Sequence, residues 1–342
     1  MAVDRGSDGS APGGRPIVLF LSRTFSVFAL RDRDILEEEY DIESVQATRN
    51  LPRLMLEMWR GLSRASLLYV YFAGWHALLA LLLARVRKVS VVLVTGGYDV
   101  TCVPEISYGA RCSGWQEAVS RYVLEHADLV LPFSESARRE VLEFATPRDM
   151  RTLHFGFRPE RFEPRGERED VVVSVGNVKA SNVRRKGHGT FVDAAQYLPD
   201  TRFILVGGSE DGGLEELKSR ASANVEFTGP MDNDDVIDLL WRSQVYVQVS
   251  GHEGFGCSLA EAMLCGCVPV VTKRFAIPEV VGDTGYYVPF EDPEATAEAI
   301  RTALADRERG RLARERVLER FPHTKRRDAL LAAVGRLIER GR

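Results

Sequence analysis

The order of short apolar runs and helical patterns constrains the fold of this chain more than any other feature. The runs are unbroken stretches rich in valine, leucine and isoleucine, as expected of strands that helices cover on both faces. In the first half of the chain they are IVLFL at 17–21, SLLYVYF at 66–72, SVVLVT at 90–95 and LVLP at 129–132. The helical patterns lie at 51–62, 75–86, 115–126 and 134–145. Strand and helix in alternation predict βαβ units and a parallel sheet.

The same alternation resumes after a break at residues 157–170. That segment, FRPERFEPRGERED, is charged, contains two prolines and has no apolar period, which is typical of a linker. Further strand patterns follow at 171–176, 202–208, 225–229, 245–250 and 268–272. A chain of 342 residues is also too long for one ordinary core. We therefore predict an α/β protein in which two Rossmann-like domains face each other across a cleft.

The predicted organisation has four parts. Residues 1–15 are polar and rich in glycine and proline, and we expect a disordered leader there. An N-terminal domain is predicted at 16–160 and a C-terminal domain at 161–322. Residues 323–342 carry apolar side chains at helical spacing, and we expect this helix to pack back toward the N-terminal domain.

Composition excludes several classes of function. The net charge of -4, from 45 basic and 49 acidic side chains, gives no field that would hold a nucleic acid. The five cysteines lack the paired spacing of metal or redox sites, so we predict a reducing, cytoplasmic location. The leader has no apolar stretch of the kind found in signal peptides. The longest apolar run, at 75–86, is too short to span a bilayer and predicts a buried helix.

The stretch GHEGFGCSLAEAMLCGC at 251–267 is the strongest candidate for a site. It follows a strand, so its glycines fall at the carboxyl end of the sheet, where ligands of α/β proteins bind. Glycines allow a close approach of the backbone, and the first N–H groups of a helix bind anions such as phosphate. Glu253 and Glu261 would accept hydrogen bonds from the hydroxyls of a sugar or ribose. Alternatively, Ser258 and Glu261 match a capping box that closes the helix.

The segment EGFGCSLAEAMLCGCVPVV resembles the E-x7-E signature of the family-four retaining glycosyltransferases, which have the GT-B fold. GNVKASNVRRKGHGTFVDAAQYLPDTRFILVG resembles the lysine-bearing donor motif of that family. ADLVLPFSESARREV resembles the last strand-helix unit of the family's first domain, and FGFRPERFEP resembles its entry into the interdomain segment. The resemblance implies that Glu253 contacts the donor sugar, Glu261 binds the ribose and Lys186 neutralises the diphosphate. It places the following residues around the donor: Gly176, Asn177, Gly254, Phe255, Gly256, Cys257, Ser258 and Leu259.

The resemblance further implies transfer of a hexose from a nucleotide diphosphate sugar, which is a co-substrate and not a cofactor. The acceptor would be a hydroxyl of a saccharide, a lipid-linked or a small molecule. Retention is explained by front-face attack, with covalent catalysis by Glu253 as the rival account. We favour a positioning role for Glu253. Two other functions stay open: a non-catalytic protein that binds nucleotide sugars, and a sugar-nucleotide epimerase of the same fold.

The chain departs from the family pattern at two places. Asn177 stands where the family commonly has an arginine, so the charge would come from Arg184 or Arg185, and we assign Arg185. A histidine that follows the fourth strand in many members is absent. In its place the chain has GGYD, and we predict these residues on the acceptor side: Gly96, Gly97, Tyr98 and Asp99.

Two other features have alternative interpretations. The acidic stretches at 32–34 and 232–235 imitate metal-binding D-x-D motifs, but we interpret both as helix caps and expect no metal. The segment at 49–64 mixes basic residues with Leu, Met and Trp. It could lie on a membrane, although we favour a helix that faces the core.

Overall fold

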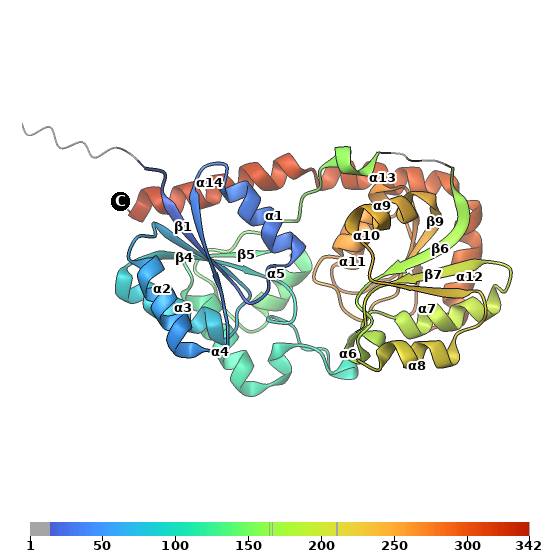
Figure 1. Ribbon diagram of the computed structural model, residues 1–342, viewed down its shortest axis with the longest axis horizontal. Coiled ribbons are helices and arrows are strands. Elements are labelled where there is room, and N and C mark those ends of the chain that lie inside the picture. The colour runs from blue at the N-terminus through green and yellow to red at the C-terminus, as the bar shows by residue number, and fades with distance from the viewer. Residues whose placement is uncertain (1–13, 164, 166, 210, 342) are drawn as a thin grey trace, which may run out of the picture.

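The structure is a computed structural model that describes residues 14–163, 165, 167–209 and 211–341. It contains two α/β units, each built around a parallel sheet, that lie side by side (Figure 1). This architecture confirms the predicted fold class. Most of the predicted leader, residues 1–13, lies outside the described residues. Within the described part of the chain, no helix combines the length and the hydropathy needed to cross a membrane.

The N-terminal sheet has the strand order β2-β1-β3-β4-β5, and all neighbours pair in parallel. Its strands are β1 (Ile17–Ser22), β2 (Asp41–Gln46), β3 (Leu67–Tyr71), β4 (Ser90–Thr95) and β5 (Leu129–Pro132). The sequence pattern missed β2. This strand is at the edge of the sheet and only Val45 is buried in it, so it has no continuous apolar run.

Helices cover both faces of this sheet. They are α1 (Val27–Leu36), α2 (Leu51–Leu62), α3 (Trp75–Arg87), α4 (Gly114–His126) and α5 (Glu135–Leu142), with short 3-10 turns η1 (Pro104–Ile106) and η2 (Ala110–Cys112). The prediction that residues 75–86 form a buried helix is wrong for one face of α3. Leu82 and Val86 are 45% and 68% exposed, whereas Ala77, Ala80 and Ala84 pack on the sheet. The apolar run is continuous only because the outer face is also apolar.

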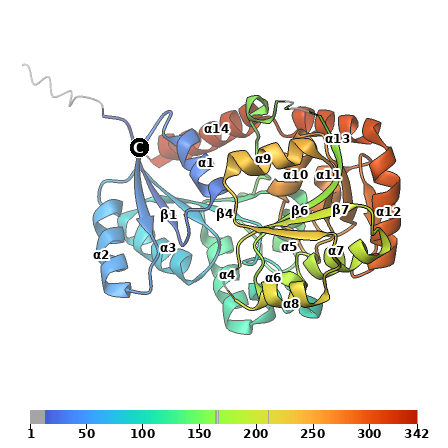
Figure 2. The ribbon, with the colours of Figure 1, turned by 45° about the vertical axis from the view of Figure 1, so that its right-hand side comes forward.

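The C-terminal sheet has the strand order β11-β10-β9-β6-β7-β8. Its strands are β6 (Glu169–Val175), β7 (Arg202–Val206), β8 (Val225–Gly229), β9 (Ser243–Gln248), β10 (Val268–Thr272) and β11 (Tyr286–Val288). The helices on its two faces, visible in Figure 2, are α6 (Ala180–Val183), α7 (His188–Ala194), α8 (Gly213–Arg220), α9 (Asn233–Arg242), α10 (Cys257–Leu264), α11 (Ile277–Val281), α12 (Pro293–Ala305) and α13 (Arg307–Arg320). The chain also forms two further 3-10 turns, η3 (Pro159–Phe162) and η4 (Ala195–Tyr197). The sequence pattern missed the short edge strand β11.

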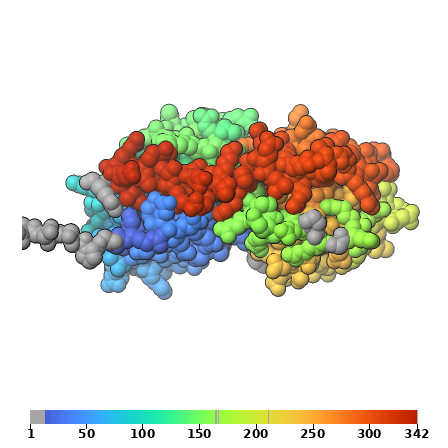
Figure 3. Space-filling view, turned by 90° about the horizontal axis from the view of Figure 1, so that it is seen from above, coloured from blue at the N-terminus to red at the C-terminus, as the bar shows by residue number. Residues whose placement is uncertain are grey.

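The last helix, α14 (His323–Gly341), lies along the N-terminal unit although it follows the C-terminal one (Figure 3). It contacts α1, β3 and β4. Its anchor is Arg326, which is 4% exposed and forms a two-pronged ion pair with Asp32 of α1 at 2.7 Å. The hydroxyls of Tyr69 and Tyr71 also donate to Asp32. Burial and the charge of Asp32 raise the pKa of both tyrosines, so they remain protonated donors.

The position of Asp32 corrects one prediction from the sequence. Asp32 does not cap a helix but lies inside α1, fully buried, with a partner that is 294 residues away in the chain. No local pattern could reveal that partner. The second acidic stretch matches its prediction more closely, because Asp232 is the residue before α9, although its side chain makes no capping bond.

The cysteines also differ from the prediction. Cys102 and Cys112 form a disulfide, with their Cα atoms 5.0 Å apart. An antiparallel bridge between Val103 and Tyr108 folds the intervening segment and brings its two ends together. The inference of fully reduced cysteines from their spacing is therefore wrong for this pair. Cys257, Cys265 and Cys267 are free, and the predicted cytoplasmic location stays a prediction.

The buried pair between α1 and α14 leads to a stability prediction. Asp32→Ala leaves the Arg326 guanidinium buried without its counter-ion, and we expect a loss of about 3 to 5 kcal/mol in the free energy of unfolding. Urea denaturation measures this loss. Asp34→Ala on the same helix, whose side chain is 57% exposed, should change the free energy by less than about 1 kcal/mol.

The double variant Asp32→Leu with Arg326→Met removes both charges and should recover stability relative to Asp32→Ala. Equal stability of Asp32→Ala and Asp34→Ala would show that the buried pair does not hold α14 in place.

Candidate active site

Two loops at the carboxyl ends of β6 and β9 form one surface. The backbone N–H of Gly251 donates to the carbonyl of Arg185 at 2.7 Å, and the Ser250 hydroxyl oxygen lies 3.3 Å from the carbonyl oxygen of Lys186. Gly187, at φ +72°, lies so close to Val249 that a Cβ there would be 2.3 Å from its carbonyl oxygen. Only glycine fits this position. The lysine motif and the glutamate motif, which lie far apart in the sequence, are therefore neighbours.

Lys186 and Glu253 form an ion pair at the centre of this surface. Lys186 Nζ is 2.6 Å from Glu253 Oε1, which also accepts from the Ser250 hydroxyl at 3.1 Å. Glu253 is 8% exposed. Burial raises the pKa of Glu253, but Lys186 and Arg185 outweigh burial and hold the pKa below its usual range. The carboxylate is therefore ionised at neutral pH.

The first turn of α10 follows directly. Its N-cap is Gly256, in the left-handed region at φ 99°, and no side chain in the described part of the chain caps this helix. The capping-box interpretation is wrong: Ser258 is already inside the helix, and the Glu261 carboxylate does not return to the helix start. The backbone donors of this turn, together with the positive end of the helix dipole, suit an anion.

Glu261 instead binds a residue of the other domain. Arg31 of α1 donates to Glu261 Oε1 at 2.8 Å, and its guanidinium also lies 5.6 Å from the centre of the Phe157 ring. The sequence around Arg31 carries no local signal of this contact, because its partner is 230 residues away. Each of the two predicted acids therefore holds a cation in the structure, Glu253 within its own domain and Glu261 across the domain boundary.

The two arginines before Lys186 point in different directions. Arg185 donates to Asn182 Oδ1 at 2.8 Å and to the carbonyl of His252 at 3.4 Å, and it lies over the Tyr108 ring. Arg184 binds Glu291 and the backbone of the N-terminal domain. Of the two, Arg185 is the one that lies beside the Lys186 and Glu253 pair.

The start of the β6 loop is closely packed. A Cβ on Gly176 would be 3.1 Å from the ring of His188, which is 1% exposed. Burial, with the charges of Lys186 and Arg185, lowers the pKa of His188 to about 3, so this ring is neutral at physiological pH. Asn177 is exposed beside this loop, and its carbonyl accepts from the Asn182 amide.

The predicted acceptor loop meets the predicted donor loop. A Cβ on Gly254 would lie 2.0 Å from the carbonyl oxygen of Gly96, which is itself at φ +139°. The backbones of the two domains therefore touch at these glycines. Phe255 is 2% exposed and packs edge-on against Phe155 and Phe321 in an aromatic cluster, so only its backbone is available to a ligand.

The Asp99 carboxylate holds the predicted acceptor loop in place through hydrogen bonds. Its carboxylate accepts from the backbone N–H groups of Ala73 at 2.9 Å and Gly97 at 3.0 Å and from the Thr95 hydroxyl. Burial raises the pKa of Asp99, although these bonds act in the opposite direction. Tyr98 is half-exposed and lies edge-on to Tyr108. The carboxylate is committed to its own domain, and a role for Asp99 beside an acceptor hydroxyl stays a prediction.

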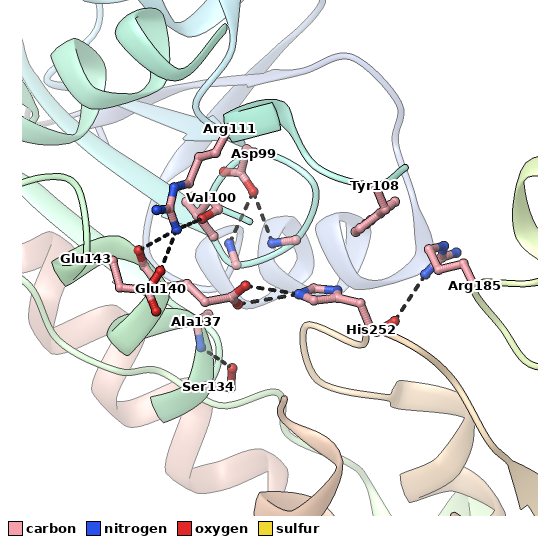
Figure 4. A network of polar contacts seen from close by, with 12 residues as sticks. Asp99, Val100, Tyr108, Arg111, Ser134, Ala137, Glu140, Glu143, Arg185 and His252 are labelled. Carbon is pink, nitrogen blue, oxygen red and sulfur yellow. Dashed lines mark hydrogen bonds and ion pairs between the residues drawn. The ribbon is translucent and has the colours of Figure 1, made fainter. Parts of the chain in front are cut away.

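Two further residues at this surface, His252 and Glu140, are not among the site residues predicted from the sequence. In the structure both are buried, at 0% and 5% exposure, and they face each other across the domain boundary (Figure 4). His252 Nε2 is 3.2 Å from Glu140 Oε1. Glu140 belongs to α5 of the N-terminal domain, and His252 immediately precedes Glu253. No sequence signal links the two residues, because their contact exists only when the domains meet.

A second contact joins α5 to the C-terminal domain. The Glu279 carboxylate of α11 accepts from the backbone N–H groups of Glu135 at 2.9 Å and Ser136 at 3.3 Å, at the start of α5. His154 binds the same carboxylate. Burial would raise the pKa of Glu279, but the bonds from His154 and the two N–H groups hold it below its usual range. An acid of one domain thus caps a helix of the other.

The chemistry available at this surface follows from its groups. The open first turn of α10, Lys186 and Arg185 can bind an anion with several negative charges. Glu253 and Glu261 can accept hydrogen bonds from hydroxyls. Within the described residues, no group of three or more His, Cys, Asp or Glu side chains could hold a metal ion. Independence from metal stays a prediction.

The sequence of this chain is similar to those of known proteins. The family "Glycosyl transferases group 1" matches residues 169–306, most of the C-terminal domain. N-acetyl-alpha-D-glucosaminyl L-malate synthase of Bacillus anthracis is 28% identical over 279 residues, which cover 75% of this chain and 70% of that protein. Alpha-maltose-1-phosphate synthase of Mycolicibacterium smegmatis is 30% identical over 292 residues, with coverage of 75% and 71%.

Solved structures show the same fold. Anabaena Alr3699/HepE, solved in complex with UDP and glucose, superposes with a TM-score of 0.78 at 18% identity, over 94% of this chain and 100% of that one. Sucrose-phosphate synthase from Thermosynechococcus elongatus gives a TM-score of 0.74 at 19% identity, over 95% and 99%. Both match the two-domain GT-B architecture. With a relative at 30% identity matched over 71% of its length, the chain belongs to the glycosyl transferases group 1 family.

Proposed function

We propose that this glycosyltransferase is a retaining, metal-independent hexosyltransferase. It moves a hexose from a nucleotide diphosphate sugar to a hydroxyl of a saccharide, lipid-linked or small-molecule acceptor. The observation that carries the proposal is the Lys186 and Glu253 pair beside the uncapped first turn of α10, with Glu261 one turn further along the same helix. The UDP complexes of Alr3699/HepE support a nucleotide sugar as the donor.

The donor would bind in three parts. The diphosphate lies on the first turn of α10 and is neutralised by Lys186 and Arg185. The ribose hydroxyls bind Glu261, and the hexose hydroxyls bind Glu253. A diphosphate also competes with Glu253 for the Lys186 ammonium, so donor binding weakens the ion pair between these residues. The Glu253 carboxylate can then accept hydrogen bonds from the sugar hydroxyls.

Catalysis would come from stabilisation of the leaving group. When the sugar–phosphate bond breaks, negative charge develops on the diphosphate, and one preorganised donor aimed at such charge is worth about 3 to 4 kcal/mol. Lys186, Arg185 and the α10 turn are such donors. The buried Glu253 oxygen is already bound by a lysine and a serine, which favours positioning of the sugar over covalent attack and supports front-face transfer with retention.

Of the three proposed acceptor classes, the surface of α2 supports the lipid-linked one. Leu54, Met58 and Leu62 face the core as predicted, but four other large apolar residues of this helix do not. The exposed ones, at 40–48% exposure, are Leu51, Met55, Leu56 and Trp59. Arg87 of α3 stacks on Trp59 at 3.6 Å from the ring centre. An apolar surface bordered by a cation suits the contact of a peripheral protein with lipid.

Acceptor-dependent release of nucleotide diphosphate tests the function directly. UDP-, GDP- and ADP-sugars are first screened by thermal shift, and the sugar that binds is then incubated with saccharide and lipid-linked acceptors. A transferase releases nucleotide diphosphate only when donor and acceptor are both present, and the product keeps the anomeric configuration of the donor. Conversion of the donor without acceptor would identify an epimerase, and binding without any release would identify a non-catalytic protein.

Glu261→Ala should weaken the binding of the nucleotide diphosphate about 10-fold to 100-fold, because hydrogen bonds to a charged group contribute roughly 1.5 to 3 kcal/mol. Isothermal titration calorimetry measures the change. Glu298→Ala, which removes an exposed acid on α12, is the control and should bind as the wild type does. Unchanged affinity of Glu261→Ala would mean that the residue serves only as the partner of Arg31.

Lys186→Ala should reduce turnover about 100-fold to 1000-fold, through the loss of one charged donor to the leaving group. Binding of the diphosphate should weaken, whereas binding of the corresponding nucleoside, which has no phosphate, should not. Lys218→Ala, which removes an exposed lysine of α8, controls for the loss of a positive charge. If nucleoside and diphosphate lose the same affinity, the effect of Lys186→Ala is structural and the assigned role is wrong.

A further inference from the structure

We propose that His252 and Glu140 form a positioning pair across the domain boundary, which places Glu253 correctly only when the two domains are together. The inference rests on the proposed function, in which Glu253 holds the donor sugar. It adds a buried acid of the N-terminal domain, Glu140, to the residues that position a donor site whose proposed ligand-binding groups lie in the C-terminal domain.

The side chain of His252 is enclosed by both domains. It is 0% exposed, and its ring lies 5.2 Å from the ring of Tyr108 and 4.2 Å from that of Phe275, measured between centres. Tyr108 belongs to the N-terminal domain and Phe275 to the C-terminal one. Nε2 faces the Glu140 carboxylate at 3.2 and 3.5 Å (Figure 4). His252 therefore inserts from the donor loop into a polar site that the N-terminal domain provides.

The backbone of His252 is part of the donor site. Its carbonyl accepts from Arg185, whose own carbonyl accepts from Gly251, the residue before His252. The next residue is Glu253, which binds Lys186. Because the side chain and the carbonyl of His252 are both held, the peptide that leads into Glu253 has little freedom to rotate. A substitution of the His252 side chain therefore changes the position of the Glu253 carboxylate, which contacts Lys186.

The carboxylate of Glu140 is costly to leave without a partner. Its side chain is 7% exposed, and an unpaired buried carboxylate is strongly unfavourable. The rest of α5 is fixed: Glu279 caps the start of the helix, and Arg111 binds the carbonyl of Glu140 and the side chain of Glu143. Since α5 is held at both ends, the Glu140 carboxylate has a defined position, and separation of the domains removes its partner.

A purely structural pair makes a different prediction from a positioning pair. If the two residues only stabilise the closed arrangement, their removal lowers the melting temperature and leaves the turnover of the folded enzyme unchanged. If they position Glu253, their removal lowers kcat, while nucleotide affinity changes little because Lys186, Glu261 and the α10 turn are intact. Kinetics and binding together therefore separate the two roles.

The experiment uses the full chain with Glu140→Gln, His252→Gln and the double variant. We expect kcat to fall about 10-fold in each single variant, which corresponds to 1.4 kcal/mol, and no further in the double variant, because both substitutions alter the same contact. The Kd for whichever of UDP, GDP or ADP the wild type binds should stay within about 2-fold. Glu135→Gln, an exposed acid on the same helix, is the matched control and should keep the kcat of the wild type.

Three outcomes would overturn the positioning pair: a wild-type kcat in Glu140→Gln, losses that multiply in the double variant, or a loss of nucleotide affinity equal to the loss of kcat. Hydrogen exchange of the backbone amides at 251–256 provides a readout that does not depend on activity. Exchange should be faster in both single variants than in the wild type and in Glu135→Gln. Unchanged exchange in both variants would also overturn the pair.

The exchange measurement also separates this inference from the proposed function. A wild-type protein that shows no acceptor-dependent release of nucleotide diphosphate, while both variants show faster exchange at 251–256, overturns the proposed function and supports the link between His252 and Glu140. Acceptor-dependent release that persists unchanged in both variants supports the function and overturns the positioning pair.

Discussion

The close contact between two glycine loops, one from each domain, is the constraint on which the candidate site depends. Gly254 approaches the carbonyl of Gly96 so closely that a Cβ would be 2.0 Å from it. This approach brings the carboxyl ends of two parallel sheets to one boundary, where ligands of α/β proteins bind. His252 can then reach Glu140, and Glu261 can reach Arg31. A larger side chain at either glycine would separate all of these groups together.

The charges at this boundary are arranged in pairs. Glu253 is neutralised by Lys186 and Glu261 by Arg31, and the Glu279 carboxylate binds the start of α5. The two of these contacts that cross the boundary, Glu261 with Arg31 and Glu279 with the start of α5, are lost when the domains separate and therefore favour the closed arrangement. In the proposed reaction, a diphosphate replaces one of these partners and the ribose competes for another. Donor binding and the relative position of the domains are then coupled through the same side chains.

Other contacts also join the N-terminal and C-terminal parts of the chain. The buried Asp32 and Arg326 pair fixes α14 on the N-terminal domain, and an aromatic cluster around Phe255 continues through the interdomain segment. The disulfide between Cys102 and Cys112 closes the segment that carries Tyr108, which contacts His252. The ion pair and the aromatic packing thus join the two parts of the chain, whereas the disulfide acts within the N-terminal domain.

The sequence by itself determined which sheet strands have continuous apolar runs and that the chain divides into two α/β units. It also determined that Glu253 and Glu261 lie on a glycine-rich loop and on the helix that follows it. Those features depend on local periodicity and on glycines that precede a helix, which are readable along the chain. Only the tertiary structure decided the edge strands β2 and β11, the burial of Asp32, the disulfide and the partners of Glu261 and His252. These depend on contacts across as many as 294 residues, and no local pattern records which distant side chain will neutralise a buried charge.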